Sequence, residues 1–288
     1  MPFLALVAVL LAAVTHATWN LSAKRAAGAR HFVWLYSTLS VALYTPVIAW
    51  IVITTRPAFG WIHWAALSAT AALHICYSLL LQAGYRASDL SLVYPLVRGS
   101  GPLFSFLLAA LLLGERVTWV SVFGVVSVVS GIVLVSGMLS SEHKAPRAGI
   151  FFGIGTGMFT AAYTINDGWA VKVLMISPFI VDYAGNVVRM LVLSPRAWLD
   201  RAAVRREAGE YARPVAIVSV LGPLGYILVL FAMQLAPISH VAPARELATL
   251  IGAYYGARVL KEKAAPSRLL GAACIVAGVV SLALADTR

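Results

Sequence analysis

Long apolar stretches separated by short polar connections fill almost the whole chain. Each stretch has about 20 residues, the length that crosses roughly 30 Å of hydrocarbon at 1.5 Å per residue. The pattern predicts an all-α integral membrane protein of the inner (plasma) membrane, with no segment left over for a soluble domain. Ten transmembrane helices are expected at residues 3–23, 31–54, 61–84, 91–113, 117–139, 148–170, 177–195, 214–235, 239–260 and 266–285.

The second half of the sequence repeats the first. Leu113-Gly114-Glu115-Arg116 corresponds to Leu260-Lys261-Glu262-Lys263, and the same offset pairs Gly124 with Gly271 and Gly131 with Gly278. Five helices in each copy is an odd number, so the copies should cross the bilayer in opposite orientations, as in many secondary transporters. We expect repeats at 1–139 and 148–288 with a linker at 140–147.

Charge sets the expected orientation of these helices. Apolar residues make up 61% of the chain and charged residues 11%, yet the net charge is +11. Basic residues gather in the loops after helices 1, 3, 5, 7 and 9, whereas the other side holds only Arg56, Arg116, Lys172 and Arg288. The positive-inside rule therefore predicts that both termini lie outside the cytoplasm. We interpret the charge as topology and attraction to anionic lipid headgroups, and not as nucleic-acid binding.

Two proline-containing segments correspond between the copies. Ser91-Leu-Val-Tyr-Pro-Leu-Val-Arg98 and Ser239-His-Val-Ala-Pro-Ala-Arg-Glu246 are each followed by an apolar helix, an acidic turn and a glycine-bearing helix. With the opening His16-Ala-Thr-Trp-Asn20 and Lys24, they resemble the drug/metabolite transporter superfamily, EamA type, over essentially the whole chain. The resemblance implies a five-plus-five inverted repeat with a cavity lined by helices 1 to 4 and 6 to 9. Family members are commonly drawn with cytoplasmic termini, opposite to the charge-based prediction.

Arginines at bilayer depth are the strongest candidates for solute binding. Each costs roughly 2.5 to 3.5 kcal/mol to insert, so such a residue persists mainly where it is paired, faces a cavity or has a function. Arg98 and Arg245 occupy matching positions after a proline, and an inverted repeat brings matching positions together near the midplane. Two guanidinium groups there would bind a carboxylate or phosphonate. Alternatively, each arginine ties together carbonyls at a helix break. Because adjacent helical residues do not share a face, Arg245 and Glu246 should have separate roles.

Buried acids are candidates for proton coupling, because burial raises the pKa of a carboxyl group. Asp167, Asp182 and Glu246 lie inside apolar stretches, although Asp167 could instead be a wetted helix end. Asp182, Asn186 and Arg189 share one helical face and could bind solute or form an internal network. Glu115 and Glu262 lie at turns and indicate helix-end charges.

Aromatic and amide side chains near the helix middles complete the expected cavity. They suit a site that hydrogen-bonds and stacks on a small molecule: Trp19, Asn20, Tyr36, Tyr77, Tyr94, Tyr163, Asn166, Tyr183 and Tyr226. His16, His74 and His240 are also intramembrane, and a lone histidine is usually a packing residue; His240 is the best candidate of the three. Small-residue stripes predict close helix packing at Gly149, Gly153 and Gly157, and at the glycine pairs of helices 5 and 10.

These features favour a secondary transporter for a small zwitterionic or anionic solute, such as an amino acid or aminophosphonate, working by alternating access with possible proton coupling. We expect no cofactor and no metal; the two cysteines, Cys76 and Cys274, lie in apolar segments. A monomer or homodimer in the lipid bilayer is expected. The alternative is an exporter of drugs or quaternary cations, which favours an acidic aromatic site. An integral-membrane enzyme is disfavoured by the lack of triad or metal spacing.

Overall fold

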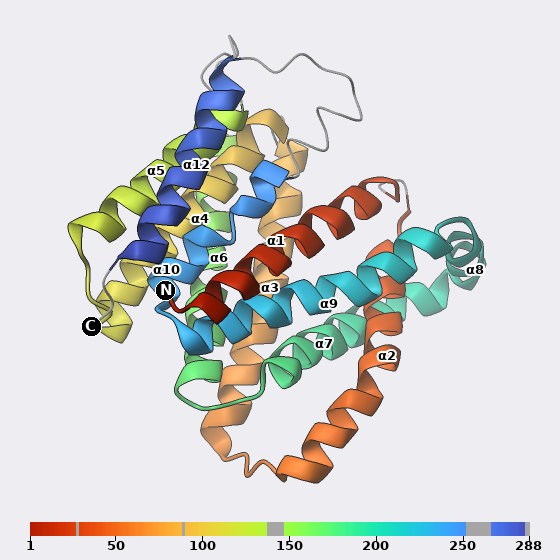
Figure 1. The fold of residues 1–288 in the computed structure, drawn as a ribbon. Helices are drawn as coiled ribbons and strands as arrows, with labels where there is room; N and C mark the ends of the chain where they lie inside the picture. Colours follow the sequence, from red (N-terminus) through yellow and green to blue (C-terminus); the bar gives the residue numbers. More distant parts are fainter. Residues whose placement is uncertain (27–28, 88–89, 137–146, 252–265, 286–288) are drawn as a thin grey trace.

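The computed structural model describes residues 1–26, 29–87, 90–136, 147–251 and 266–285, and within these ranges the chain is helical with no strand. Figure 1 shows the helices, with the N-terminus close to the end of α12, where the amino group of Met1 donates to the backbone oxygen of Ala283. The helices are α1 (Phe3–Lys24), α2 (Phe32–Thr55), α3 (Trp61–Ala87), α4 (Leu90–Leu113), α5 (Trp119–Ser136), α6 (Arg147–Lys172), α7 (Pro178–Leu199), α8 (Arg201–Glu210), α9 (Ala212–Leu235), α10 (Ile238–Ala244) and α12 (Pro266–Leu284).

Among the described residues, six helices are long and apolar enough to cross a membrane: α1, α2, α3, α4, α6 and α9. The other four expected spans depart from that pattern for different reasons. The apolar parts of α5 and α12 are shorter, at Trp119–Val135 and Leu269–Leu284. Helix α7 is continuous, but the polar side chains of Asp182 and Arg189 interrupt its apolar sequence. The expected span at 239–260 is broken near its start.

Contacts between the two halves of the chain organise the molecule. Helix α1 packs along α9, and α3 packs along α6. These two contacts correspond to each other under the repeat, because α1 matches α6 and α3 matches α9. Helix α2 packs on its counterpart α7, and α5 packs on its counterpart α12. The halves are therefore interleaved.

Glycines permit the closest of these contacts. A Cβ on Gly131 would lie 2.6 Å from the carbonyl oxygen of Gly271, and one on Gly278 would lie 2.5 Å from that of Gly124. The atoms in the way are backbone, so any side chain would force α5 and α12 apart. Both glycine pairs are packing faces, as the sequence predicts, and the structure sets them against each other.

The glycine stripe of α6 packs on α4. A Cβ on Gly153 would lie 2.8 Å from the Cβ of Leu96, and one on Gly157 would collide with Ser100. The predicted small-residue packing face is confirmed at these two positions. The same part of α4 carries Arg98, which lies between Leu96 and Ser100 in the sequence.

The second proline segment breaks its helix. Helix α10 ends at Ala244, the residue after Pro243. A turn follows at Arg245 and Glu246, and the chain is helical again at 247–251. The ring of Pro243 removes one backbone N–H donor, which weakens a continuous helix here. The expected span at 239–260 is therefore broken after its proline within the described residues, and a helix break is one of the alternatives that the sequence leaves open. Helix α4, in contrast, continues through Pro95 and Arg98.

Two carboxylates cap helices that belong to the other repeat. Glu115, after α4, accepts hydrogen bonds from the backbone N–H groups of Ile238 and Ser239, both at 2.8 Å, at the start of α10. Glu207 on α8 accepts from Arg30 at 3.0 Å and His31 at 2.8 Å, just before α2. Negative charge at a helix N-terminus satisfies free N–H donors and the helix dipole. Glu115 is thus a charge at a helix end, and the helix end that it caps belongs to the other repeat; Glu262 lies outside the described residues.

Candidate functional site

Arg98 and Arg245 meet at one buried carboxylate. The guanidinium of Arg98 donates to both oxygens of Glu246, at 3.3 and 3.4 Å, and Nε of Arg245 lies 3.7 Å from Glu246 Oε1. Glu246 is 1% exposed, and the hydroxyl of Thr249 donates to it at 3.1 Å. Nη2 of Arg98 also lies 3.2 Å from Nε2 of His16. We call Arg98, Arg245, Glu246 and His16 the arginine cluster.

The helix break creates this cluster. In a continuous helix Arg245 and Glu246 would point about 100° apart. Here the two side chains lie 3.7 Å apart, so they share a face and contact each other. The turn at these two residues allows Glu246 to contact both Arg245 and Arg98 of α4. Because arginine carries only donors, Nε2 of His16 must accept, which makes His16 neutral with its proton on Nδ1. The cluster therefore holds two positive charges and one negative charge.

A second polar cluster surrounds Asp167 on α6, which has no exposed surface. Its oxygens accept hydrogen bonds from four side chains: Thr70 at 2.6 Å, His74 at 3.1 Å, Asn166 at 3.2 Å and Tyr226 at 2.5 Å. We call these five residues the Asp167 cluster. The alternative of a wetted helix end is excluded, because the carboxylate is fully buried and held by α3, α6 and α9.

Tyr163 lies between the two clusters. Its ring stacks on His74 with centroids 4.1 Å apart, and the guanidinium carbon of Arg245 lies 6.0 Å from the same ring. Tyr77 contacts Tyr163 edge-on at 5.6 Å, and Tyr226 contacts His74 edge-on at 5.7 Å. One aromatic ring thus separates an excess of positive charge from a buried carboxylate. We call the two clusters with Tyr163 and Tyr77 the polar core.

The polar face of α7 forms a separate chain of contacts. Asn186 donates to Asp182 Oδ2 at 3.0 Å and accepts from Arg189 at 3.2 Å, so the amide bridges the acid and the base. Tyr183 shares a 2.8 Å hydrogen bond with Thr45 on α2. These contacts fit the internal network that the sequence leaves open as an alternative to solute binding.

Other candidates lie at the edge of the polar core or away from it. Trp19 meets His16 edge-on at 4.8 Å, so it borders the arginine cluster, and with Tyr36 it also packs on an apolar group around Phe32. Asn20 is half-buried on α1. His240 lies near the start of α10, in the wall of the hollow described below. Tyr94 is in α4, and its side chain lies outside the part that the structure describes.

Sequence reasoning misses three members of the polar core. The pattern predicts packing roles for His16 and His74 and does not single out Thr70, because a lone intramembrane histidine or threonine has no distinctive spacing. Their partners come from other helices. Only the helix order in space pairs His16 with Arg98 and His74 with Asp167.

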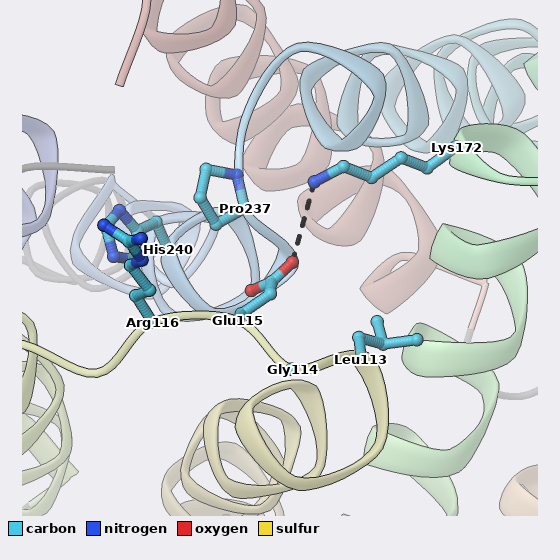
Figure 2. Close-up of a pocket in the computed structure, with 7 residues that line it drawn as sticks. All are labelled: Leu113, Gly114, Glu115, Arg116, Lys172, Pro237 and His240. Atoms are coloured by element: carbon cyan, nitrogen blue, oxygen red, sulfur yellow. Dashed lines mark ion pairs between the residues drawn. The ribbon is translucent and has the colours of Figure 1, made fainter. Parts of the chain in front are cut away.

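A charged hollow of about 240 Å³ opens beside the polar core, at the ends of α4, α6 and α10. Figure 2 shows Glu115 and Lys172 facing each other across it, 3.6 Å apart, with Arg116 and His240 on another wall. Asp167 lies five residues before Lys172 on α6, a rise of roughly 7.5 Å. The hollow therefore lies at the helix ends, a short distance along α6 from the polar core.

Hydrogen bonding and charge are the chemistry that the polar core offers. No group of three His, Cys, Asp or Glu side chains with metal-binding geometry occurs in the described residues. Carboxylates, guanidinium groups and tyrosine rings here can bind a charged or zwitterionic molecule and can hold protons.

Comparison with known proteins identifies the family. A model of the EamA-like transporter family matches residues 3–137 and again residues 147–284. One similar solved structure, described only as the crystal structure of a protein, has a TM-score of 0.72 and 16% identity, covering 97% of this chain and 98% of that chain; this likeness concerns the fold. No curated protein matches the sequence. Since the family model matches both halves and six of the helices in the described ranges are of membrane-spanning length, the chain is a multi-pass membrane protein that belongs to the EamA-like transporter family.

Proposed function

We propose that this protein is a secondary active transporter that moves a small zwitterionic or anionic metabolite across the inner membrane. The charge pattern of the polar core carries the proposal. The arginine cluster has one positive charge in excess, and the buried carboxylate of Asp167 lies on the other side of Tyr163. A solute with a carboxylate or phosphonate at one end and an ammonium at the other complements both clusters.

Glu246 occupies the two arginines that the solute would bind, so the carboxylate and an anionic solute compete for the same guanidinium groups. It contacts both arginines, so an incoming anion binds Arg98 and Arg245 by displacing this carboxylate. A proton on Glu246 weakens the same contacts and releases the guanidinium groups. This exchange links proton movement to solute binding, with Asp167 and Asp182 as further proton-carrying candidates.

Alternating access accounts for the arrangement of the repeats. We infer opposite orientations for them, which the corresponding contacts of α1 with α9 and of α3 with α6 support. The two carboxylate caps join the repeats at separate places: Glu115 holds the start of α10, and Glu207 holds the start of α2. When one repeat rocks against the other, these caps open in turn.

Uptake into proteoliposomes tests the solute class. Purified protein should take up an amino acid or aminophosphonate, and Arg98→Gln should lower that uptake by about ten-fold or more, since a charge-assisted pair is lost. Asp167→Asn should lower uptake of the zwitterion more than uptake of an anion without an amino group. Arg56→Gln, at the far end of α2, is the matched control and should leave uptake unchanged. Normal zwitterion uptake by Arg98→Gln would contradict the proposed site.

Export of quaternary or other organic cations is the second candidate function. The observation that favours it is the aromatic surround of Asp167, where the rings of Tyr163, His74 and Tyr226 lie in contact. Cations bind such acidic aromatic sites through charge and ring faces. Transport of a quaternary amine that depends on Asp167 but not on Arg98 would favour this function over the first.

A further inference from the structure

The short helix α8 occupies a constrained place in the fold. Only Asp200 separates it from α7, and only Tyr211 separates it from α9. Figure 1 shows α8 at the ends of these two helices, running crosswise to α9. Because α9 is a membrane-spanning helix and α8 ends within one residue of its start, α8 lies at the level of the lipid headgroups.

The two faces of α8 carry different chemistry. Glu207 points inward, is 4% exposed, and caps the start of α2. Asp200, which begins α8, lies 3.4 Å from His31, and the hydrogen bond with His31 holds the pKa of Asp200 below its ordinary value. Arg201, Arg205 and Arg206 are exposed on the outward side. We call these three residues the arginine face; none of them forms an ion pair among the described residues.

Apolar anchors border the arginine face. Trp198 is 65% exposed and Leu199 is 89% exposed at the end of α7. The guanidinium carbon of Arg201 lies 5.9 Å from the Trp198 ring centroid. Tryptophan is enriched where hydrocarbon meets headgroups, because its ring is apolar and its N–H is polar. Arg196 and Arg213, also exposed, extend the positive charge along the ends of α7 and α9.

We propose that the arginine face of α8 is a binding surface for anionic phospholipid headgroups. Phosphate groups accept several N–H bonds from a guanidinium, and the headgroup layer is the surface that the fold sets against this face. Trp198 and Leu199 insert beside the same lipids. The opposite face of the same helix holds α2 through Glu207, so bound lipid stabilises the contact between α8 and α2.

Lipid retention tests this surface directly, without any transport measurement. The full-length protein, purified in mild detergent, is mixed with phosphatidylglycerol or phosphatidylcholine, and bound lipid is counted by native mass spectrometry. Phosphatidylglycerol should bind in preference and should raise the melting temperature. The triple variant Arg201→Gln, Arg205→Gln and Arg206→Gln should retain about ten-fold less phosphatidylglycerol, since each basic residue at the surface contributes to the attraction.

Two further variants separate lipid binding from folding. Replacement of the same three arginines by lysine should keep most of the binding, because the charge remains. Arg56→Gln removes an exposed arginine at the other end of α2 and should change nothing. Equal retention of the two lipids by the wild type would overturn the proposal, as would unchanged phosphatidylglycerol binding in the glutamine variant. Preferential binding of an RNA or an acidic peptide to the same arginines, with no lipid preference, would also overturn it.

Discussion

Glu246 balances two guanidinium groups inside the membrane, and its removal should be costly. In a buried ion pair, loss of one partner leaves an uncompensated charge that water no longer solvates. In Glu246→Gln, Arg98 and Arg245 face each other without their shared counter-charge. The amide should lower the free energy of unfolding by about 3 kcal/mol, measured by unfolding in mixed micelles.

A double variant provides the control for this effect. Arg98→Gln combined with Glu246→Gln removes one charge of each sign, so it should be less destabilised than the sum of the two single variants. If Glu246→Gln alone were as stable as the wild type, the carboxylate would not be the counter-charge of the arginines. At this scale, the sequence predicted Arg98, Arg245, Glu246 and Asp167 as candidates, but not which side chains they contact.

Helices α5 and α12 show how a sequence pattern becomes a packing contact. In Gly131→Ala the new Cβ would lie 2.6 Å from a backbone oxygen, so the helices must separate. We expect a loss of roughly 1 to 3 kcal/mol, as for other overpacked positions, measured by thermal melting. Gly185→Ala on α7 is the matched control, since a Cβ added there would meet nothing within 4 Å. Equal stability of the two variants would contradict the contact.

The carboxylate caps are the second prediction for helices. Glu115→Gln should speed hydrogen exchange at the amides of Ile238 and Ser239, because a neutral side chain is a weaker acceptor at a helix N-terminus. Glu207→Gln should speed exchange at Arg30 and His31 instead. Mass spectrometry of peptides from the two regions measures both effects. Each variant is the control for the other, and a change at both helix starts in either variant would refute independent caps.

The whole molecule has a predicted orientation that labelling can decide. With Cys76 and Cys274 replaced by serine, the variant Arg205→Cys should react with a membrane-impermeant thiol reagent only from the cytoplasm. The variant Thr55→Cys, at the last residue of α2, should react only from outside. The physical reason is the positive-inside rule applied to the arginines of α8 and its neighbours. Reaction of Arg205→Cys from outside would show that all the helices have the opposite orientation to the predicted one.

The sequence by itself determined that the chain is helical, lies in the membrane and contains a repeat. Hydrocarbon offers no hydrogen-bond partners, so long apolar stretches must form helices, and the corresponding motifs fix which helices match. The glycine stripes likewise predicted close packing, because only the absence of a side chain permits it.

Only the tertiary structure decided which polar residues form the polar core. The turn after Pro243 brings Arg245 into contact with its neighbour Glu246, which helical periodicity alone argues against. His16 and His74 gain their roles from arginine and aspartate on distant helices. Such pairs depend on how helices lie side by side and on local breaks in a helix. A linear pattern reports the face that a residue occupies, whereas its partner is set by the packing of the whole molecule.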